Sequence, residues 1–177
     1  MNVGTSISVE EYLRTSYDNP DPEFRDGELE ERSLPDYIHG KTQALLVALF
    51  FALQSRLPVF PSVATRLRLR KNLVLIPDVT VFHPSEPSSG VPEFPPLIAI
   101  EVLSADDRLT KLRSKLEEYR AWGIQHVWLV DPHQRRMYTC DNGFREVTSL
   151  RVPEFELEIL PAAIFPPPRE SAPAPAP

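Results

Sequence analysis

The chain has 177 residues, of which 42% are hydrophobic and 25% are charged, so it is long enough for one domain with a real core. A single cysteine, Cys140, excludes an intrachain disulfide and a cysteine cluster for zinc, so a metal would need oxygen or histidine ligands. The formal charge of -6, concentrated in the first 40 residues, argues against a general nucleic-acid coat. With no signal-like basic and apolar start, the chain is expected to be cytoplasmic.

The first elements are predicted to be a short helix, a hairpin and a long buried helix. Residues 8–16 form a helix capped by Ser8, and residues 22–33 form two strands that turn at Asp26-Gly27. Residues 36–57 have the length of a helix, and its nearly continuous apolar surface predicts that other elements cover it. Its most apolar window is about half the ~20 residues that a bilayer span needs, so no membrane contact is expected.

Strands follow in the middle of the chain. Between residues 64 and 82 the period of two places three arginines on one side of a strand, Arg66, Arg68 and Arg70, with a turn near Asn72. The proline-rich stretch 83–96 is predicted to be a loop. Residues 97–104, apolar on both faces, predict a strand in the centre of the sheet.

The last third alternates in the same way. Residues 104–123 predict a helix that is capped by Ser104 or Asp106 and ended by Gly123. Three further strand regions follow, the second of them turning at Asn142-Gly143, at residues 125–132, 135–147 and 155–160. The order predicts an α/β fold in one domain, residues 1–165, followed by a disordered proline- and alanine-rich tail, residues 166–177.

Two acids interrupt strands that are otherwise apolar. Asp78 follows Pro77, and Glu101 shares one strand face with Ala99 and Leu103. A buried carboxylate must be protonated, paired with a base or bound to a cation. Glu101 could form a structural ion pair with an arginine of residues 66–70, and Asp78 could simply begin a strand. Taken together, two oxygen donors on successive strands favour a site for Mg²⁺ or Mn²⁺.

The helix that follows Glu101 offers a base. Its apolar positions fall on one stripe that should face the sheet, Leu109, Leu112, Leu116 and Tyr119. Lys115 and Arg108 lie on the border of that stripe, so either could reach inward, or both could cover the edge of the core with their alkyl chains. The four histidines lack the paired helical spacing of a zinc site, namely His39, His83, His126 and His133.

The order of these motifs resembles a known family. Pro77-Asp78, the strand acid Glu101 in "EVLS", then Lys115 and Tyr119 in "KLEEYRAWG" are similar to the Uma-type family of restriction-endonuclease-like proteins, in the PD-(D/E)XK nuclease superfamily. The resemblance covers most of the chain outside the tail. It implies a restriction-endonuclease-like central mixed β-sheet flanked by helices, with an N-terminal β-hairpin. It also implies a metal held by Asp78 and Glu101, with Lys115 as the third catalytic residue.

The chain departs from the superfamily pattern at two positions. Leu103 stands two residues after the strand acid, where a lysine is usual, and Lys115 matches a lysine that has moved to the next helix. Lys111 stands where many relatives carry an aspartate. The family also has an acid after the glycine of its first hairpin, and either Glu28 or Glu31 could complete the metal site here. Because acids are frequent in residues 9–31, a solvated face is the favoured interpretation of both, and neither is included in the predicted site.

The predicted function is a Mg²⁺- or Mn²⁺-dependent endonuclease that hydrolyses phosphodiester bonds in DNA, with the three arginines of residues 66–70 on the nucleic-acid backbone. The resemblance implies a homodimer, because cutting both strands requires two sites. Two alternatives come from other classes. One is a catalytically inactive, nucleic-acid-binding module on the same fold, and the other is a metal-free structural or oligomerisation domain.

Overall fold

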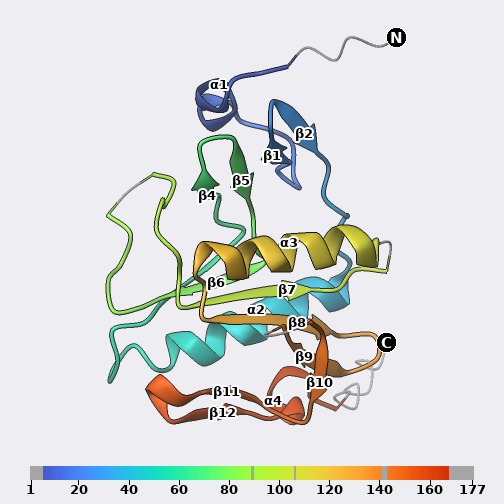
Figure 1. Cartoon of the computed structure of the whole chain (residues 1–177). Helices are drawn as coiled ribbons and strands as arrows, with labels where there is room; N and C mark the ends of the chain where they lie inside the picture. Colours follow the sequence, from blue (N-terminus) through green and yellow to red (C-terminus); the bar gives the residue numbers. More distant parts are fainter. Residues whose placement is uncertain (1–5, 89, 106, 141–142, 168–177) are drawn as a thin grey trace, which may run out of the picture.

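A six-stranded mixed sheet forms the centre of the molecule (Figure 1). The computed structural model describes residues 6–88, 90–105, 107–140 and 143–167. In spatial order the strands of this sheet are β10 (Arg145–Val147), β9 (Arg136–Thr139), β8 (His126–Asp131), β7 (Ile98–Val102), β6 (Val79–Phe82) and β3 (Phe60–Val63). The strand predicted to be central is confirmed as β7, whose five residues are all buried.

The sheet combines one parallel pair with antiparallel pairs. β7 runs parallel to β8, and the chain crosses between them through helix α3 (Leu109–Trp122), as a parallel connection requires. The other neighbours in this sheet are antiparallel. The α/β class and the central mixed sheet flanked by helices are therefore confirmed.

The two faces of the sheet pack against different layers. One face meets α3 through residues such as Ala99, Leu116 and Leu129. The other face meets helix α2 through residues such as Leu46, Phe50 and Trp128. Helix α2 spans Tyr37–Phe51. The same apolar cluster includes the C-terminal elements, which are β11 (Leu150–Val152), the 3₁₀ turn η1 (Pro153–Phe155), β12 (Leu157–Ile159) and α4 (Pro161–Ile164).

A second sheet stands at one end of the first, at the top of Figure 1. Its order is β2 (Glu28–Glu30), β1 (Glu23–Arg25), β5 (Leu73–Leu75) and β4 (Leu67–Arg70), with α1 (Val9–Arg14) against it. The short segment 76–78 connects β5 of this sheet to β6 of the central sheet. Asp78 is therefore the residue directly before β6, at the junction of the two sheets.

Local sequence signals account for most element ends. Ser8 accepts a hydrogen bond from the backbone N–H of Glu11 at 3.1 Å and caps α1, as predicted. The predicted hairpin at Asp26-Gly27 joins β1 to β2, and Gly27 has the positive φ of 95° that this turn needs. Gly123, with φ of 105°, ends α3 in the left-handed conformation.

One predicted helix cap is wrong, and other predictions concern residues outside the described ranges. Ser104 does not cap α3, because the helix begins after Arg108 without a side-chain cap. Asp106, Asn142 and most of the predicted tail (residues 168–177) lie outside the described residues, although β9 and β10 pair as a hairpin around Gly143. The edge strand β3 and the strand β11 carry too short a pattern to have been predicted. Within the described ranges, no helix is long and apolar enough to cross a membrane.

Two adjacent phenylalanines of α2 test how this helix is buried. Phe50 is fully buried against the sheet, whereas Phe51 is 51% exposed. Phe50→Ala should lower the free energy of unfolding by about 3–5 kcal/mol, because it leaves a cavity in the core. Phe51→Ala should lower it by about 1 kcal/mol or less. Chemical denaturation of both variants measures the difference, and equal losses would show that this face of α2 is placed wrongly.

Candidate metal and phosphodiester site

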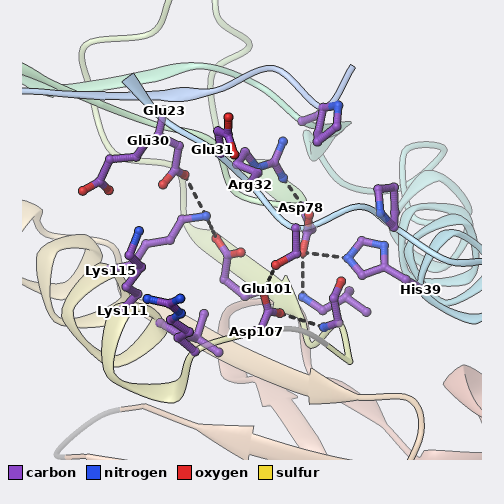
Figure 2. Close-up of a pocket in the computed structure, with 18 of the residues that line it drawn as sticks. Glu23, Glu30, Glu31, Arg32, His39, Asp78, Glu101, Asp107, Lys111 and Lys115 are labelled. Carbon is purple, nitrogen blue, oxygen red and sulfur yellow. Dashed lines mark hydrogen bonds and ion pairs between the residues drawn. The ribbon is translucent and has the colours of Figure 1, made fainter. Parts of the chain in front are cut away.

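The register of β6 and β7 brings the two predicted acids together. Val79 pairs with Ile100 and Thr80 with Ala99, so one further step places Asp78 opposite Glu101. Residues that lie opposite each other on antiparallel strands project to the same face of a sheet. Figure 2 shows both carboxylates turned into one pocket. The sequence predicted acids on successive strands, and the register makes them neighbours.

Asp78 is buried and held by three donors. Its Oδ1 accepts a hydrogen bond from Arg32 Nη2 at 2.9 Å. Its Oδ2 lies 3.2 Å from His39 Nε2 and accepts from the backbone N–H of Val102 at 2.8 Å. Burial raises the pKa of Asp78, but the His39 contact and the positive charges of Lys115 and Arg32 outweigh it and lower the pKa overall. Asp78 is therefore ionised at neutral pH.

Helix α2 supplies two of the groups around Asp78. Gln43 Nε2 donates to the backbone carbonyl of Asp78 at 2.5 Å, one helical turn after His39. The buried stripe of α2 thus begins with His39 and Thr42 and continues with Leu46 and Phe50. Polar residues at the start of a buried stripe were the available signal for this side of the site. The contact of His39 with Asp78 was not predicted from the sequence.

Glu101 is buried against α3, where two donors meet one of its oxygens. Lys115 Nζ and Tyr119 Oη each lie 2.8 Å from Oε1. Lys115 is thus the base that reaches inward, while Arg108 stays exposed at the pocket. Leu112, Leu116 and Tyr119 are buried as the stripe predicted; the side chain of Leu109 lies outside the described part.

A third acid, Glu23 of β1, completes this cluster. Its Oε1 lies 2.8 Å from Lys115 Nζ and accepts a hydrogen bond from the backbone N–H of Ile76 at 2.8 Å. Lys115 also donates to the carbonyl of Ile76 at 3.0 Å. The ammonium group therefore joins the small sheet, the sheet junction and the central sheet. Sequence reasoning missed Glu23 because it stands among many acids of the N-terminal region.

Burial and neighbouring charges shift the pKa values of Glu101, Lys115 and Tyr119. Burial raises the pKa of Glu101 to about 7, an effect that Asp78 and Glu23 reinforce and that Lys115 opposes. Burial lowers the pKa of Lys115, but Glu101 and Glu23 outweigh it, so the pKa rises overall. Burial, with the negative charge of Glu101, also raises the pKa of Tyr119. At neutral pH Lys115 is an ammonium group and Tyr119 is a neutral phenol, and both donate to Glu101.

These side chains line a cavity of about 340 Å³ between the two sheets and the two long helices. Its floor carries Asp78, Glu101 and Lys115, as Figure 2 shows. Charged residues also line it from the β2–α2 segment and from the start of α3, namely Glu30, Glu31, Arg32, Asp107, Arg108 and Lys111. Of the two acids considered for completing a metal site, Glu31 lines the cavity and Glu28 does not.

The three arginines of residues 66–70 lie elsewhere, in ion pairs. Arg66 binds Asp21 through two nitrogens, Arg68 meets Glu10 and Glu93, and Arg70 lies 3.5 Å from Glu118. The strand β4 is also irregular between Arg68 and Arg70, so the simple alternation fails. The structural ion pair predicted between Glu101 and one of these arginines is wrong, because Lys115 takes that place.

Oxygen donors make the cavity suitable for a hard divalent cation. Asp78 and Glu101 face the same space, and Oε2 of Glu101 accepts no hydrogen bond from the described residues. Among those residues, however, no three His, Cys, Asp or Glu side chains are grouped closely enough to hold a metal. Mg²⁺ commonly takes only one or two protein carboxylates and completes its shell with water and phosphate oxygens. The donor set fits such an ion and not a closed all-protein cage.

A comparison with known proteins identifies the family of this chain. Residues 9–169 match the Uma2 family, described as "Putative restriction endonuclease". The chain belongs to the Uma2 family.

Among solved structures, a protein from Anabaena variabilis that is described as a putative nuclease belonging to DUF820 has a similar fold. The TM-score is 0.76 at 20% sequence identity, over 90% of this chain and 97% of the other. A search of curated proteins gives no significant match. The resemblance to an Uma-type, nuclease-like family is thus confirmed, and this Uma2 chain has the fold and family of a nuclease.

The structure shows where the two departures of this Uma2 chain from the superfamily pattern lie. Leu103 follows β7, partly buried in the core beneath α3, and Lys111 is exposed at the edge of the cavity. The lysine that contacts the strand acid comes from the helix, at Lys115. The serine once considered as a helix cap, Ser104, donates its backbone N–H to Asp107 at 2.7 Å, and Asp107 accepts from Ser33 at 2.6 Å.

The pKa of Glu101 gives a direct test of its burial. A carboxyl with a pKa of about 7 in the folded protein should titrate well above the 4.5 of an ordinary glutamate. Because the folded state then holds a proton that the unfolded chain has released, raising the pH from about 4.5 to about 7 removes stability that Glu101 contributes. Carboxyl ¹³C resonances of glutamate-labelled protein, assigned with Glu101→Gln, measure the midpoint. A midpoint near 4.5 contradicts a buried Glu101.

Proposed function

We propose that this Uma2 protein is a divalent-metal-dependent endonuclease that hydrolyses phosphodiester bonds in DNA, with Mg²⁺ or Mn²⁺ as its ion. One observation carries the proposal. Asp78 and Glu101 lie opposite each other on adjacent strands, face one polar cavity and have the ammonium group of Lys115 at 2.8 Å from Glu101. The family and the fold support a nuclease, and the ion and the DNA substrate are part of the proposal.

Asp78 and Glu101 would hold the ion through their carboxylate oxygens. A divalent ion there supplies neutralisation of phosphate charge and a lower pKa for a bound water. Asp78 is ready for this role because it is ionised at neutral pH. Glu101 has a pKa of about 7, so a large fraction of it must release a proton before it can act as a ligand.

Lys115 acts in this proposal as a donor and not as a base. Its pKa is raised, so it keeps its proton at neutral pH and cannot accept one from water. Its three N–H groups already face Glu101, Glu23 and the carbonyl of Ile76. By exchanging one of these bonds it would orient the attacking water or stabilise the negative charge that develops on the phosphate.

Contacts to the nucleic-acid backbone are assigned to the edge of the cavity. Arg108 and Lys111 are exposed, line the cavity, and have no ion pair with the described residues. The arginines of residues 66–70 already have carboxylate partners, so their use for DNA would require those pairs to open.

We further propose that residues 1–165 act as one domain, and that two copies pair to cut both strands.

The acid pair is tested by removing charge without changing shape. Asp78→Asn and Glu101→Gln should each reduce Mg²⁺- or Mn²⁺-dependent nicking of supercoiled plasmid by about 100-fold or more, because several kcal/mol of charge stabilisation are lost. Glu28→Gln is the matched control, since Glu28 is exposed and outside the cavity. EDTA should abolish cleavage by the unmodified protein. Equal nicking by all variants would point to a contaminating nuclease and reject the assignment.

Two lysines of α3, one turn apart, test the role of the ammonium group. Lys115→Gln should lower the rate of nicking by about 10²–10³-fold, the usual effect of losing one preorganised donor. Lys111→Gln should leave the chemical rate nearly unchanged and mainly weaken DNA affinity, because Lys111 is exposed at the edge. Single-turnover rates at saturating protein separate the two effects. Similar single-turnover rates for both variants would remove Lys115 from the mechanism.

A catalytically inactive, DNA-binding module is the second candidate. The observation in its favour is that the protein's own cations already compensate the acid pair, with Arg32 on Asp78 and Lys115 on Glu101. Such a protein would bind DNA equally well in EDTA and in Mg²⁺ and would cleave no substrate. The plasmid experiment distinguishes the two candidates.

A further inference from the structure

Arg32 stands out among the arginines that contact acids in this structure. Its Nη2 donates to Asp78 Oδ1 at 2.9 Å, and no other hydrogen bond of its guanidinium is found within the described ranges. Arg25 and Arg66, by contrast, each bind one carboxylate through two nitrogens. A guanidinium has five N–H donors in a planar fork. Most donors of Arg32 are therefore unused, although its side chain is only 16% exposed.

The surroundings of Arg32 direct these unused donors into the site. Arg32 lines the same cavity as Asp78 and Glu101, and Figure 2 shows its guanidinium beside Asp78. It belongs to residues 31–36, which connect β2 to α2 without regular secondary structure. That segment is anchored beside it, because Ser33 donates to Asp107 at 2.6 Å and Asp36 caps α2. The backbone is thus fixed while the side chain can change partner.

The two cations of the site differ in how firmly they are held. Lys115 is bound to Glu101, to Glu23 and to the carbonyl of Ile76, so three contacts hold its ammonium group in place. Within the described part of the chain, Arg32 is held by Asp78 alone, the carboxylate that the proposed function assigns to a metal ion. A guanidinium and a divalent cation that require the same oxygen exclude or repel each other.

We propose that Arg32 is the phosphate-binding residue of this site and that it is held on Asp78 until a divalent cation takes its place there. Once displaced, Arg32 offers its fork to two oxygens of a substrate phosphate in the same cavity, a geometry that guanidinium groups match. Its charge then stabilises the phosphate instead of Asp78. This inference rests on the proposed function, because it concerns the same acid pair.

Metal affinity and DNA affinity should move in opposite directions when Arg32 is neutralised. Arg32→Gln should bind Mn²⁺ at least about threefold more tightly, because a competing charge is gone. The same variant should bind a short DNA duplex about tenfold more weakly in Ca²⁺, because a charged phosphate contact is lost. Isothermal titration with Mn²⁺ and fluorescence anisotropy of a labelled duplex measure the two values. Arg151→Gln, which changes an exposed arginine of β11 outside the cavity, should change neither markedly.

Each result decides between separate claims. If the unmodified protein binds Mn²⁺ and Arg32→Gln binds it equally or more weakly, Arg32 only supports Asp78 and the inference fails, while the proposed function stands. If Mn²⁺ binding tightens but DNA affinity is unchanged, the phosphate role is rejected. If neither protein binds Mn²⁺, the proposed function fails first.

A second variant keeps the test valid if Arg32→Gln unfolds. Arg32→Lys retains the positive charge but loses the planar fork. It should bind Mn²⁺ about as the unmodified protein does and bind the duplex more weakly, by about threefold or more. Unchanged duplex binding by a folded Arg32→Lys protein would reject bidentate phosphate recognition.

Discussion

The site depends on the placement of two carboxylates opposite each other in the buried part of a sheet. Asp78 and Glu101 are each 5% exposed, and unpaired charges at such positions would cost several kcal/mol. The surrounding elements compensate them separately. Asp78 receives donors from Arg32, His39 and a backbone N–H of β7, whereas Glu101 receives Lys115 and Tyr119 from α3. The donors keep Asp78 ionised, whereas burial raises the pKa of Glu101 to about 7 although Lys115 opposes this.

This compensation explains why the site lies at the junction of the two sheets. Ile76-Pro77 leads from the small sheet into β6, and the backbone of Ile76 binds both Glu23 and Lys115. The N-terminal hairpin, the central sheet and α3 therefore meet at one ammonium group. Removing Lys115 would leave two carboxylates without their main partner, so the same residue serves the architecture and the proposed chemistry.

The position of Lys115 on α3 also explains how the site can lack a lysine at position 103. A lysine two residues beyond Glu101 would project from the same strand face, whereas Leu103 packs in the core under α3. Lys115 reaches Glu101 from above, because α3 returns across the sheet with Leu112, Leu116 and Tyr119 against it. The ammonium group is thus placed beside the strand acid from a different element, with the core preserved.

The sequence by itself determined the α/β order, the central β7, the inward stripe of α3 and the candidates Asp78, Glu101 and Lys115. These follow from local periodicity, turn residues and isolated charges in apolar strands, which act over a few neighbouring positions. Only the tertiary structure decided that Asp78 lies opposite Glu101, that Glu23 and not Glu28 meets Lys115, and that Arg32 and His39 bind Asp78. Local patterns limit the register of a strand, but which strands pair and which distant segments approach them depends on packing across the whole core.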